Sequence, residues 1–561
     1  MEALEVKDSL ARNWLAALCI CSGRCVAEAS GAAESKKWSD RFTQSVLEWL
    51  EVPEADHQDL QDMPYGEAAN DMLLLMLRCR RDDEEAQGQK DGSTPSFSLQ
   101  IANDPESLYS GLVLTCLGLA DLLEAGDLEE IEDQKRDGRQ LRPFEYDARS
   151  RAAAFVISDW LDMPPQFVGV YESKIASSLE QAADKAKLGY AGARALESEK
   201  QRKWGWRKYL ATGAGVAVAG TLVGVTAGLA APLMVAGMGA VGIGGLGFLA
   251  TTGGAAMVGS LLGVAGGGVI GRRFNTRLRG LREFYFTQLS LGPAASAESK
   301  THSLHATMFV PGFLEAAASA SPFAPVRDVL GLDLGDAYTL YFETKELVAL
   351  QGSFVDFVRN TARNAAVSAV LAKTVLGGLL GAFTWPLAIL KFGQLIDSPW
   401  AVATERARRA GNLLADVLES RAHGTRPVTL VGYSLGALTI FACLNELHRR
   451  KAFGIVETAV LLGMPVDSTN VSSWTACCQC VSHRIIIGYS KNDWVLAFLF
   501  RASSLCAQLA GLSGVDASKI FADKPLARRK LMNIDLSSII VEHSNYLEKL
   551  DDVMLEVSRY L

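Results

Sequence analysis

The sequence has no sustained run of charge of one sign, and its 561 residues carry a formal net charge of −8. A nucleic-acid-binding surface needs a basic face, so this balance argues against nucleic acid as a partner. We expect no signal peptide here, because Glu2, Glu5, Asp8 and Arg12 stand where its apolar core would begin. We expect the opening segment to be an amphipathic helix of a folded domain, in a chain long enough for two or three folded units.

Cysteines in a metal-binding pattern are also missing. The ten cysteines include two close groups, at 19–25 and 477–480, but neither is paired with a second C-x-x-C or with histidine at zinc spacing. Reduced thiols explain these cysteines better than a metal site does. The glycine-rich segment 209–271 lacks the Lys-Ser/Thr ending and the preceding strand of a phosphate-binding loop. We therefore expect neither a metal nor another cofactor.

The segment 209–271 contains no Asp, Glu, Lys, Arg or His in its 63 residues, and nineteen of them are glycine. A helix that crosses a bilayer needs about 20 apolar residues, so the segment is long enough for two or three crossings. Gly220, Gly224 and Gly228 repeat every four residues, a spacing that lets helices pack closely in lipid. We predict a transmembrane hairpin. The alternative is a pair of Gly/Ala-rich helices buried inside protein.

Basic residues flank this apolar segment on both sides. They are Arg202, Lys203, Arg207 and Lys208 before it, and Arg272, Arg273, Arg277 and Arg279 after it. Positive charge on both flanks favours an even number of crossings with both flanks in the cytoplasm. We therefore predict an integral membrane protein, embedded in the lipid bilayer, whose C-terminal domain faces the cytoplasm.

The rest of the chain divides by its pattern of apolar residues. Spacings of three and four predict a helical N-terminal domain over 1–185, which has no motif for chemistry and suits an interaction with protein partners. A charged helix or linker is expected at 186–208, and a basic linker helix at 272–300. Over 301–561, short β-branched runs alternate with helical stretches, which predicts an α/β domain with a mainly parallel sheet.

The strands expected in this α/β domain are 305–310, 337–342, 428–431, 458–462 and 484–488. The stretch 345–426 is too long for a simple crossover, so we expect a lid-like helical insertion there. Its uncharged segment 374–390 is at the short limit for a membrane span. A lid or a membrane-facing cap is therefore favoured over a third transmembrane element.

A serine between two glycines follows one of these strands, in the segment TLVGYSLGALT at 429–439. The G-x-S-x-G pattern is weak alone, but here a strand precedes it and a helical segment follows it. Gly432 and Gly436 remove side chains that would clash in a strained strand-turn-helix elbow. Such an elbow exposes the hydroxyl of Ser434 at a helix N-terminus, where the helix dipole favours developing negative charge. Ser434 is the candidate nucleophile.

A serine nucleophile needs a base and an acid, which follow it in the chain in this type of fold. His543 lies in a loop-like step before the C-terminal helix, where the base is expected. Asp493 follows a strand at its carboxyl end, and such ends converge in a parallel sheet. His448 and His483 also follow Ser434, but the first lies on the helix just after the serine and the second opens a strand. Asp467 is the alternative for the acid, and Asp535 is too close to the expected last strand.

An oxyanion hole needs two backbone N–H groups near the serine. One is expected from Leu435, the residue after the nucleophile. The other is expected from the loop after an early strand, in ATMFVPGFLEA, where Gly312 permits a close turn. Either Phe313 or Leu314 would supply this second N–H.

Several of these segments resemble the family of transmembrane and coiled-coil domain-containing protein 4. They are RPVTLVGYSLGALTIFACLNEL, VLLGMPV, SHRIIIGYSKNDWVLAFLFR, LIDSPWAVA and NIDLSSIIVEHSNYL. The resemblance covers about 270–555, together with the apolar hairpin by type and position. It implies an α/β-hydrolase fold, a membrane region and a triad of Ser434, Asp493 and His543. It implies no particular substrate.

These features favour a membrane-anchored serine hydrolase that cleaves an ester or thioester of a lipid-like substrate. The preference for a lipid comes from the apolar segments, which place the site near a membrane. The alternative is an adaptor or membrane-trafficking scaffold that keeps a hydrolase fold without activity, because a fold does not establish activity. A pore is disfavoured, since the apolar segment offers no ionisable residue to line a pathway.

Overall fold

The structure is a computed structural model, and it describes only part of the chain. The described residues are 9–49, 52–61, 146–160, 168–170, 172–173, 176, 281–289, 303–314, 322–326, 334–352, 400–421, 423–424, 426–497, 508–521 and 525–561. The predicted charged linker 186–208, the apolar hairpin 209–271 and the uncharged segment 374–390 lie outside these residues. Among the helices that are described, none combines the length and the hydropathy of a membrane span.

Within the described residues, seven strands form one sheet in the order β1-β3-β2-β4-β5-β6-β7. The strands are β1 (Phe284–Gln288), β2 (Ala306–Val310), β3 (Asp336–Phe342), β4 (Val428–Tyr433), β5 (Val456–Leu462), β6 (Ile485–Tyr489) and β7 (Leu531–Asp535). Only β1 runs antiparallel to its neighbour among these strands, and the other pairings are parallel. The mainly parallel sheet confirms the predicted α/β class.

Both faces of the sheet are covered by helices. The helices of this part are α19 (Ala401–Glu419), α20 (Leu435–Arg449), α21 (Val471–Cys480), α23 (Ala510–Ser513), α24 (Ala517–Ile520), α25 (Pro525–Arg528), α26 (Asn545–Glu548) and α27 (Leu550–Ser558). Leu430 and Leu461 pack into one apolar cluster with α19, α20 and α21, whereas Val431 and Leu462 pack into another with α27. Successive strand residues point to opposite faces, and burial of both faces explains why β4 and β5 are apolar throughout.

The edge strand β1 corrects one expectation from the sequence. The segment 272–300 was predicted to be a basic linker helix, but residues 284–288 form β1, and Phe286 lies opposite Leu340 of β3. The sequence of β1, FYFTQ, consists mostly of aromatic and β-branched residues that prefer a pleated, half-buried surface. The basic residues before the strand favour a helix or a linker, and the preference of the short strand segment is weak beside them.

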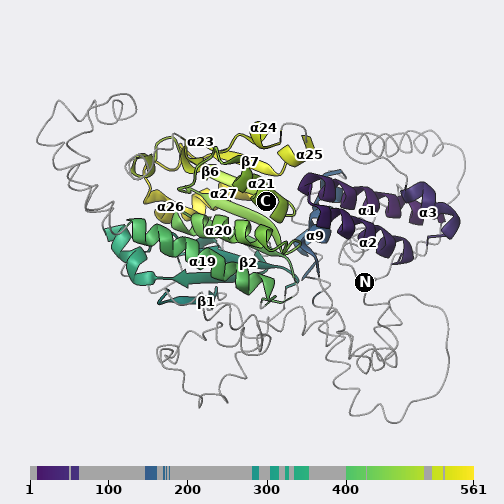
Figure 1. Ribbon diagram of the computed structural model, residues 1–561, viewed down its shortest axis with the longest axis horizontal. Helices are drawn as coiled ribbons and strands as arrows, with labels where there is room; N and C mark the ends of the chain where they lie inside the picture. Colours follow the sequence, from purple (N-terminus) through teal and green to yellow (C-terminus); the bar gives the residue numbers. More distant parts are fainter. Residues whose placement is uncertain are drawn as a thin grey trace, which may run out of the picture.

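The N-terminal helices pack beside the sheet. They are α1 (Ser9–Ser30), α2 (Ala33–Trp49), α3 (Glu54–Gln61) and α9 (Ala148–Trp160), and they share an apolar cluster of their own. Helix α9 contacts β5, and α1 contacts α21 and α25 (Figure 1). The described part of the N-terminal region is therefore helical, and it is joined to the α/β part through α9 and α1.

A buried polar network joins α9 to the amino ends of the strands. The guanidinium of Arg151 donates to Glu172 at 2.8 Å and to Glu457 of β5 at 2.9 Å. Glu457 also accepts a hydrogen bond from Thr429 of β4 at 3.0 Å, and His305 lies 2.9 Å from the Thr429 hydroxyl. All five side chains are buried. The network therefore lies at the edge of the sheet opposite to the carboxyl ends of the strands.

Candidate active site

Ser434 occupies a strained turn between β4 and α20. Its backbone angles are φ 53° and ψ −123°, in a region that residues with a side chain rarely adopt. A Cβ placed on Gly432 would lie 2.8 Å from the Gly436 carbonyl carbon, and one on Gly436 would lie 2.7 Å from that of Val310. Only glycine therefore fits on either side of this turn, as the sequence pattern indicated.

The three side chains that the sequence singled out lie together at the carboxyl edge of the sheet. Nε2 of His543 is 2.7 Å from the hydroxyl oxygen of Ser434. Nδ1 of His543 is 2.6 Å from a carboxylate oxygen of Asp493. Ser434 follows β4, Asp493 follows β6 and His543 follows β7, so the parallel strands bring together residues up to 109 positions apart. One ring nitrogen of His543 thus faces the hydroxyl and the other faces the carboxylate.

The loops that carry the acid and the histidine are bonded to each other. The hydroxyl of Ser490 donates to the carbonyl oxygen of Ile540 at 2.7 Å. The second carboxylate oxygen of Asp493 accepts the N–H of Leu496 at 3.0 Å. The side chain of Asn545 accepts the backbone N–H groups just before His543 at 3.1 Å each. The sequence pattern did not indicate a role for Ser490 or Asn545. The only available signal was that they lie close in sequence to Asp493 and His543.

The alternative residues have other partners. His448 is bonded to Gln479 at 2.7 Å, and His483 stacks on Phe155 with ring centroids 4.8 Å apart. Asp467 accepts the N–H and the hydroxyl of Thr469, and Asp535 pairs with Lys491 at 2.7 Å. Within the described residues, Asp493 is the carboxylate that is bonded to His543.

The loop after β2 lies directly against the serine turn. A Cβ placed on Gly312 would be 2.5 Å from the Leu435 nitrogen and 2.6 Å from Cβ of Ser434. The N–H of Leu435 stands at the first position of α20, where a helix leaves its N–H groups without an acceptor. Phe313 and Leu314 follow Gly312 and are both buried. The N–H groups considered for an oxyanion hole are thus on two segments in close contact.

The site is buried and partly aromatic. Ser434 and Asp493 are 0% exposed and His543 is 1% exposed. The rings of Phe313 and Tyr546 lie 5.4 Å and 5.8 Å from the His543 ring. Burial, and then the negative charge of Asp493, raise the pKa of the Tyr546 phenol well above its usual value. Electrostatic interactions are strong in such an environment, because water does not screen them.

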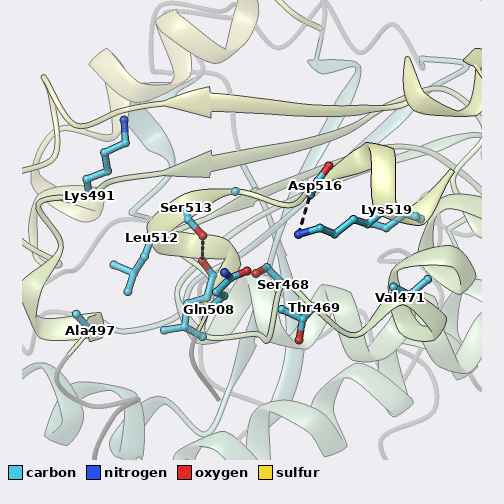
Figure 2. A pocket seen from close by; sticks show the side chains of 13 residues that line it. Ser468, Thr469, Val471, Lys491, Ala497, Gln508, Leu512, Ser513, Asp516 and Lys519 are labelled. Atoms are coloured by element: carbon cyan, nitrogen blue, oxygen red, sulfur yellow. Dashed lines mark hydrogen bonds and ion pairs between the residues drawn. The ribbon is translucent and has the colours of Figure 1, made fainter. Parts of the chain in front are cut away.

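A cavity of about 610 Å³ lies beside the loop that carries Asp493. Lys491 and Ala497, which flank Asp493 in sequence, lie along one side of it, and the ion pair of Asp516 and Lys519 lies at the other (Figure 2). The described residues that line the cavity include none of Ser434, Asp493 and His543. The cavity is therefore next to the candidate site and does not contain it.

In the described part of the chain, no group of three or more His, Cys, Asp or Glu residues is placed to hold a metal ion. Cys443, Cys477 and Cys480 are free, buried thiols, and burial raises the pKa of each of them. Thiols that stay protonated are poor metal ligands and poor nucleophiles.

Comparison with known proteins gives the family. The model of a family described as "Protein of unknown function (DUF726)" matches residues 203–559, more than half of the chain. The chain belongs to this family. A transmembrane and coiled-coil domain-containing protein of Oryza sativa subsp. japonica is 32% identical over 78% of this chain and 66% of its own length. These findings confirm the resemblance drawn from the sequence.

Other relatives of this DUF726 chain have names that differ from one another, a membrane protein in one case and a lipase in another. An uncharacterized membrane protein of Caenorhabditis elegans is 34% identical over 62% of the chain and 54% of its own length. A protein of Saccharomyces cerevisiae named as a probable lipase is 35% identical over 42% of the chain and 21% of its own length. The chain thus spans no more than 66% of these three relatives. No solved structure matches it.

Proposed function

We propose that this chain is a membrane-anchored serine hydrolase of the α/β-hydrolase fold. The observation that carries the proposal is the position of the His543 ring, 2.7 Å from the hydroxyl of Ser434 on one side and 2.6 Å from Asp493 on the other. The strained backbone of Ser434 and the order of the three residues in the chain support it. A nucleophile, a base and an orienting acid in this geometry perform acyl transfer on unrelated folds.

The first chemical step is attack by Ser434 on the carbonyl carbon of an ester or thioester. Nε2 of His543 takes the hydroxyl proton as the Ser434 oxygen forms its bond to carbon. Asp493 holds the Nδ1–H of the imidazole and stabilises the imidazolium that forms. The leaving alcohol or thiol receives the proton from Nε2, and an acyl group remains on Ser434. Water, activated by His543 in the same way, then releases the acid.

The negative charge that develops on the carbonyl oxygen needs donors held in place. We assign the N–H of Leu435 and an N–H of Phe313 or Leu314 to this oxyanion hole. The closeness of Gly312 to the Leu435 nitrogen supports the assignment, because it brings the loop after β2 next to the serine turn. A buried setting makes each of these donors worth more than it would be in water.

A lipid-like acyl ester is the substrate class that we propose. The relative named as a probable lipase supports it, although it shares only part of the chain. Relatives named as membrane proteins, and the uncharged segment 209–271, support a site that works next to a bilayer. We propose that this segment anchors the chain with both basic flanks in the cytoplasm. Protease protection of tags placed at residues 200 and 280 tests this orientation, and protection of either tag in intact organelles would contradict it.

The proposal is tested by labelling the full chain in membranes with a fluorophosphonate probe. We expect the wild type to be labelled and Ser434→Ala to lose all labelling, while Ser472→Ala, at an exposed serine, keeps it. Asp493→Asn and Asp467→Asn form a matched pair of acid substitutions. We expect the first to slow labelling by roughly a thousandfold or more, because the imidazole loses its orienting partner, and the second to leave it unchanged.

The same experiment separates the enzyme from the scaffold alternative. Equal and absent labelling of the wild type and Ser434→Ala would refute the hydrolase and favour a protein that keeps the fold for binding alone. Labelling that survives in Ser434→Ala would place the reactive residue elsewhere.

A further inference from the structure

The residue between Gly432 and Ser434 makes a hydrogen bond that connects the two halves of the candidate site. The phenol of Tyr433 donates to the carbonyl oxygen of Phe313 at 2.6 Å. The two rings also pack edge to face, with centroids 5.0 Å apart and planes at 74°. Both side chains are fully buried. The contact is thus a short, buried hydrogen bond between the serine turn and the loop after β2.

This bond fixes the direction of a peptide group. The Phe313 carbonyl and the Leu314 N–H belong to one planar trans peptide, so they point in opposite directions. A carbonyl held by the Tyr433 phenol therefore keeps the Leu314 N–H pointing away from Tyr433, and it limits rotation of the Phe313 backbone as well. Tyr433 is the residue directly before Ser434 in the chain. Movement of the loop after β2 relative to the serine therefore requires the hydrogen bond between Tyr433 and Phe313 to break.

We propose that Tyr433 is a positioning residue that holds the loop after β2, with its candidate oxyanion-binding N–H groups, at a fixed distance from Ser434. The inference rests on the proposed hydrolase function. It adds a role for a residue that neither contacts the substrate nor takes part in proton transfer. The charge that the loop stabilises exists only in the transition state, so loss of the bond lowers kcat and leaves KM nearly unchanged. The loop would keep its glycine contact with the serine turn but lose the constraint on its N–H groups.

The test compares Tyr433→Phe with Tyr338→Phe in the full chain reconstituted in lipid nanodiscs. Tyr338 is a buried tyrosine on β3, which β2 separates from β4, so this control removes a core hydroxyl away from the site. Three quantities are measured: kcat and KM for p-nitrophenyl butyrate, the affinity of a trifluoromethyl ketone that forms a tetrahedral adduct, and the rate of fluorophosphonate labelling. Thermal unfolding and circular dichroism check that each variant is folded.

We expect Tyr433→Phe to lower kcat and the ketone affinity together by roughly ten- to hundredfold, with KM within about twofold of the wild type. Tyr338→Phe is expected to match the wild type in all three. Tyr433→Met, which fills the same space without a hydroxyl, replaces the phenylalanine variant if that one does not fold. Incorporation of 3-fluorotyrosine at 433 keeps the donor and is expected to preserve the rate.

Three results would overturn the inference on different grounds. A folded Tyr433→Phe protein with wild-type kcat and ketone affinity would refute the positioning role and leave the hydrolase standing. Wild-type protein that neither turns over the ester nor takes the fluorophosphonate would refute the hydrolase, and the role of Tyr433 would fall with it. A loss confined to KM would also contradict the inference, since it would indicate substrate binding.

Discussion

At the scale of single residues, the candidate site depends on its glycines as much as on its polar side chains. Gly312 is the clearest case, because the loop after β2 rests its backbone on the backbone of the serine turn. A Cβ there would be 2.5 Å from the Leu435 nitrogen, well inside van der Waals contact, and the neighbouring atoms are backbone atoms that cannot rotate away. In the hydrolase that we propose, the separation of the two main chains at this point would set the space for an oxyanion.

We predict that Gly312→Ala strongly reduces activity while the protein remains folded. The added methyl group pushes the loop away from Leu435, and a displacement of about 1 Å is enough to reduce turnover by roughly a hundredfold. Overpacking of this kind costs about 1–3 kcal/mol of stability. Gly352→Ala is the control, since a Cβ at this exposed position meets nothing within 4 Å. The rate of fluorophosphonate labelling and the Tm check both variants; equal labelling of the two would argue against close contact at Gly312.

The principal residues of the site could be predicted because they follow strands of one parallel sheet. Ser434, Asp493 and His543 each stand after a recognisable strand, and the rule that carboxyl ends meet is enough to bring them together. Tyr433 and Asn545 could not be predicted in the same way. Their roles depend on hydrogen bonds to the backbone of segments that the sequence alone does not place, Phe313 in one case and the stretch before His543 in the other.

At the scale of elements, the same contrast holds for the strands. The central strands were predictable because both of their faces are buried, which makes them apolar throughout. The edge strand β1 pairs with the sheet along one side only, and its short sequence follows a basic segment that favours a helix or a linker. Its identity is set by pairing with β3, a tertiary effect that local preference does not contain.

The C-terminal end of α21 is held by a buried lysine that precedes β7. The ammonium group of Lys530 donates to the carbonyl oxygen of Cys478 at 2.9 Å and also to that of Val481. Such a cation satisfies carbonyl groups that a helix end leaves without partners. Burial lowers the pKa of Lys530 from 10.5 to about 8, against the smaller opposite effects of Cys478 and Cys480.

We predict that Lys530 makes the free energy of unfolding rise with pH between about 8 and 10.5. In this range the unfolded chain retains a proton that the folded chain has lost, so a higher pH favours the folded state. The wild type is expected to gain up to about 3 kcal/mol relative to Lys530→Met across this range. Denaturant unfolding at several pH values measures the difference, with Lys519→Met, at an exposed lysine, as the control that follows the wild type. Parallel curves for the wild type and Lys530→Met would contradict the prediction.

At the scale of the whole molecule, the N-terminal helices and the sheet meet through buried charge. Burial lowers the pKa of Arg151, but Glu172 and Glu457 outweigh it and the pKa rises above its ordinary value. The side chains of the three residues are at most 5% exposed. Removal of one partner from such a group leaves an uncompensated charge in a dry interior.

We predict that Arg151→Met destabilises the protein by about 3–5 kcal/mol, because two carboxylates remain buried without a cation. Arg484→Met is the matched control: Arg484 pairs with the exposed Asp159 across the same region, and its loss is expected to cost less than about 1 kcal/mol. The double variant Arg151→Met/Glu457→Gln should recover part of the loss. Chemical denaturation measures all three, and a cost for Arg151→Met as small as that of the control would refute the prediction.

The ion pair between Arg151 and Glu457 also has a consequence for synthesis of the chain. Its two members are separated by 306 positions, so α9 leaves the ribosome long before β5 exists. At roughly 5–20 residues per second, the guanidinium waits on the order of half a minute for its second carboxylate. The nascent N-terminal helices therefore present an unfinished seam during translation, and that seam can close only after Glu457 has been synthesised.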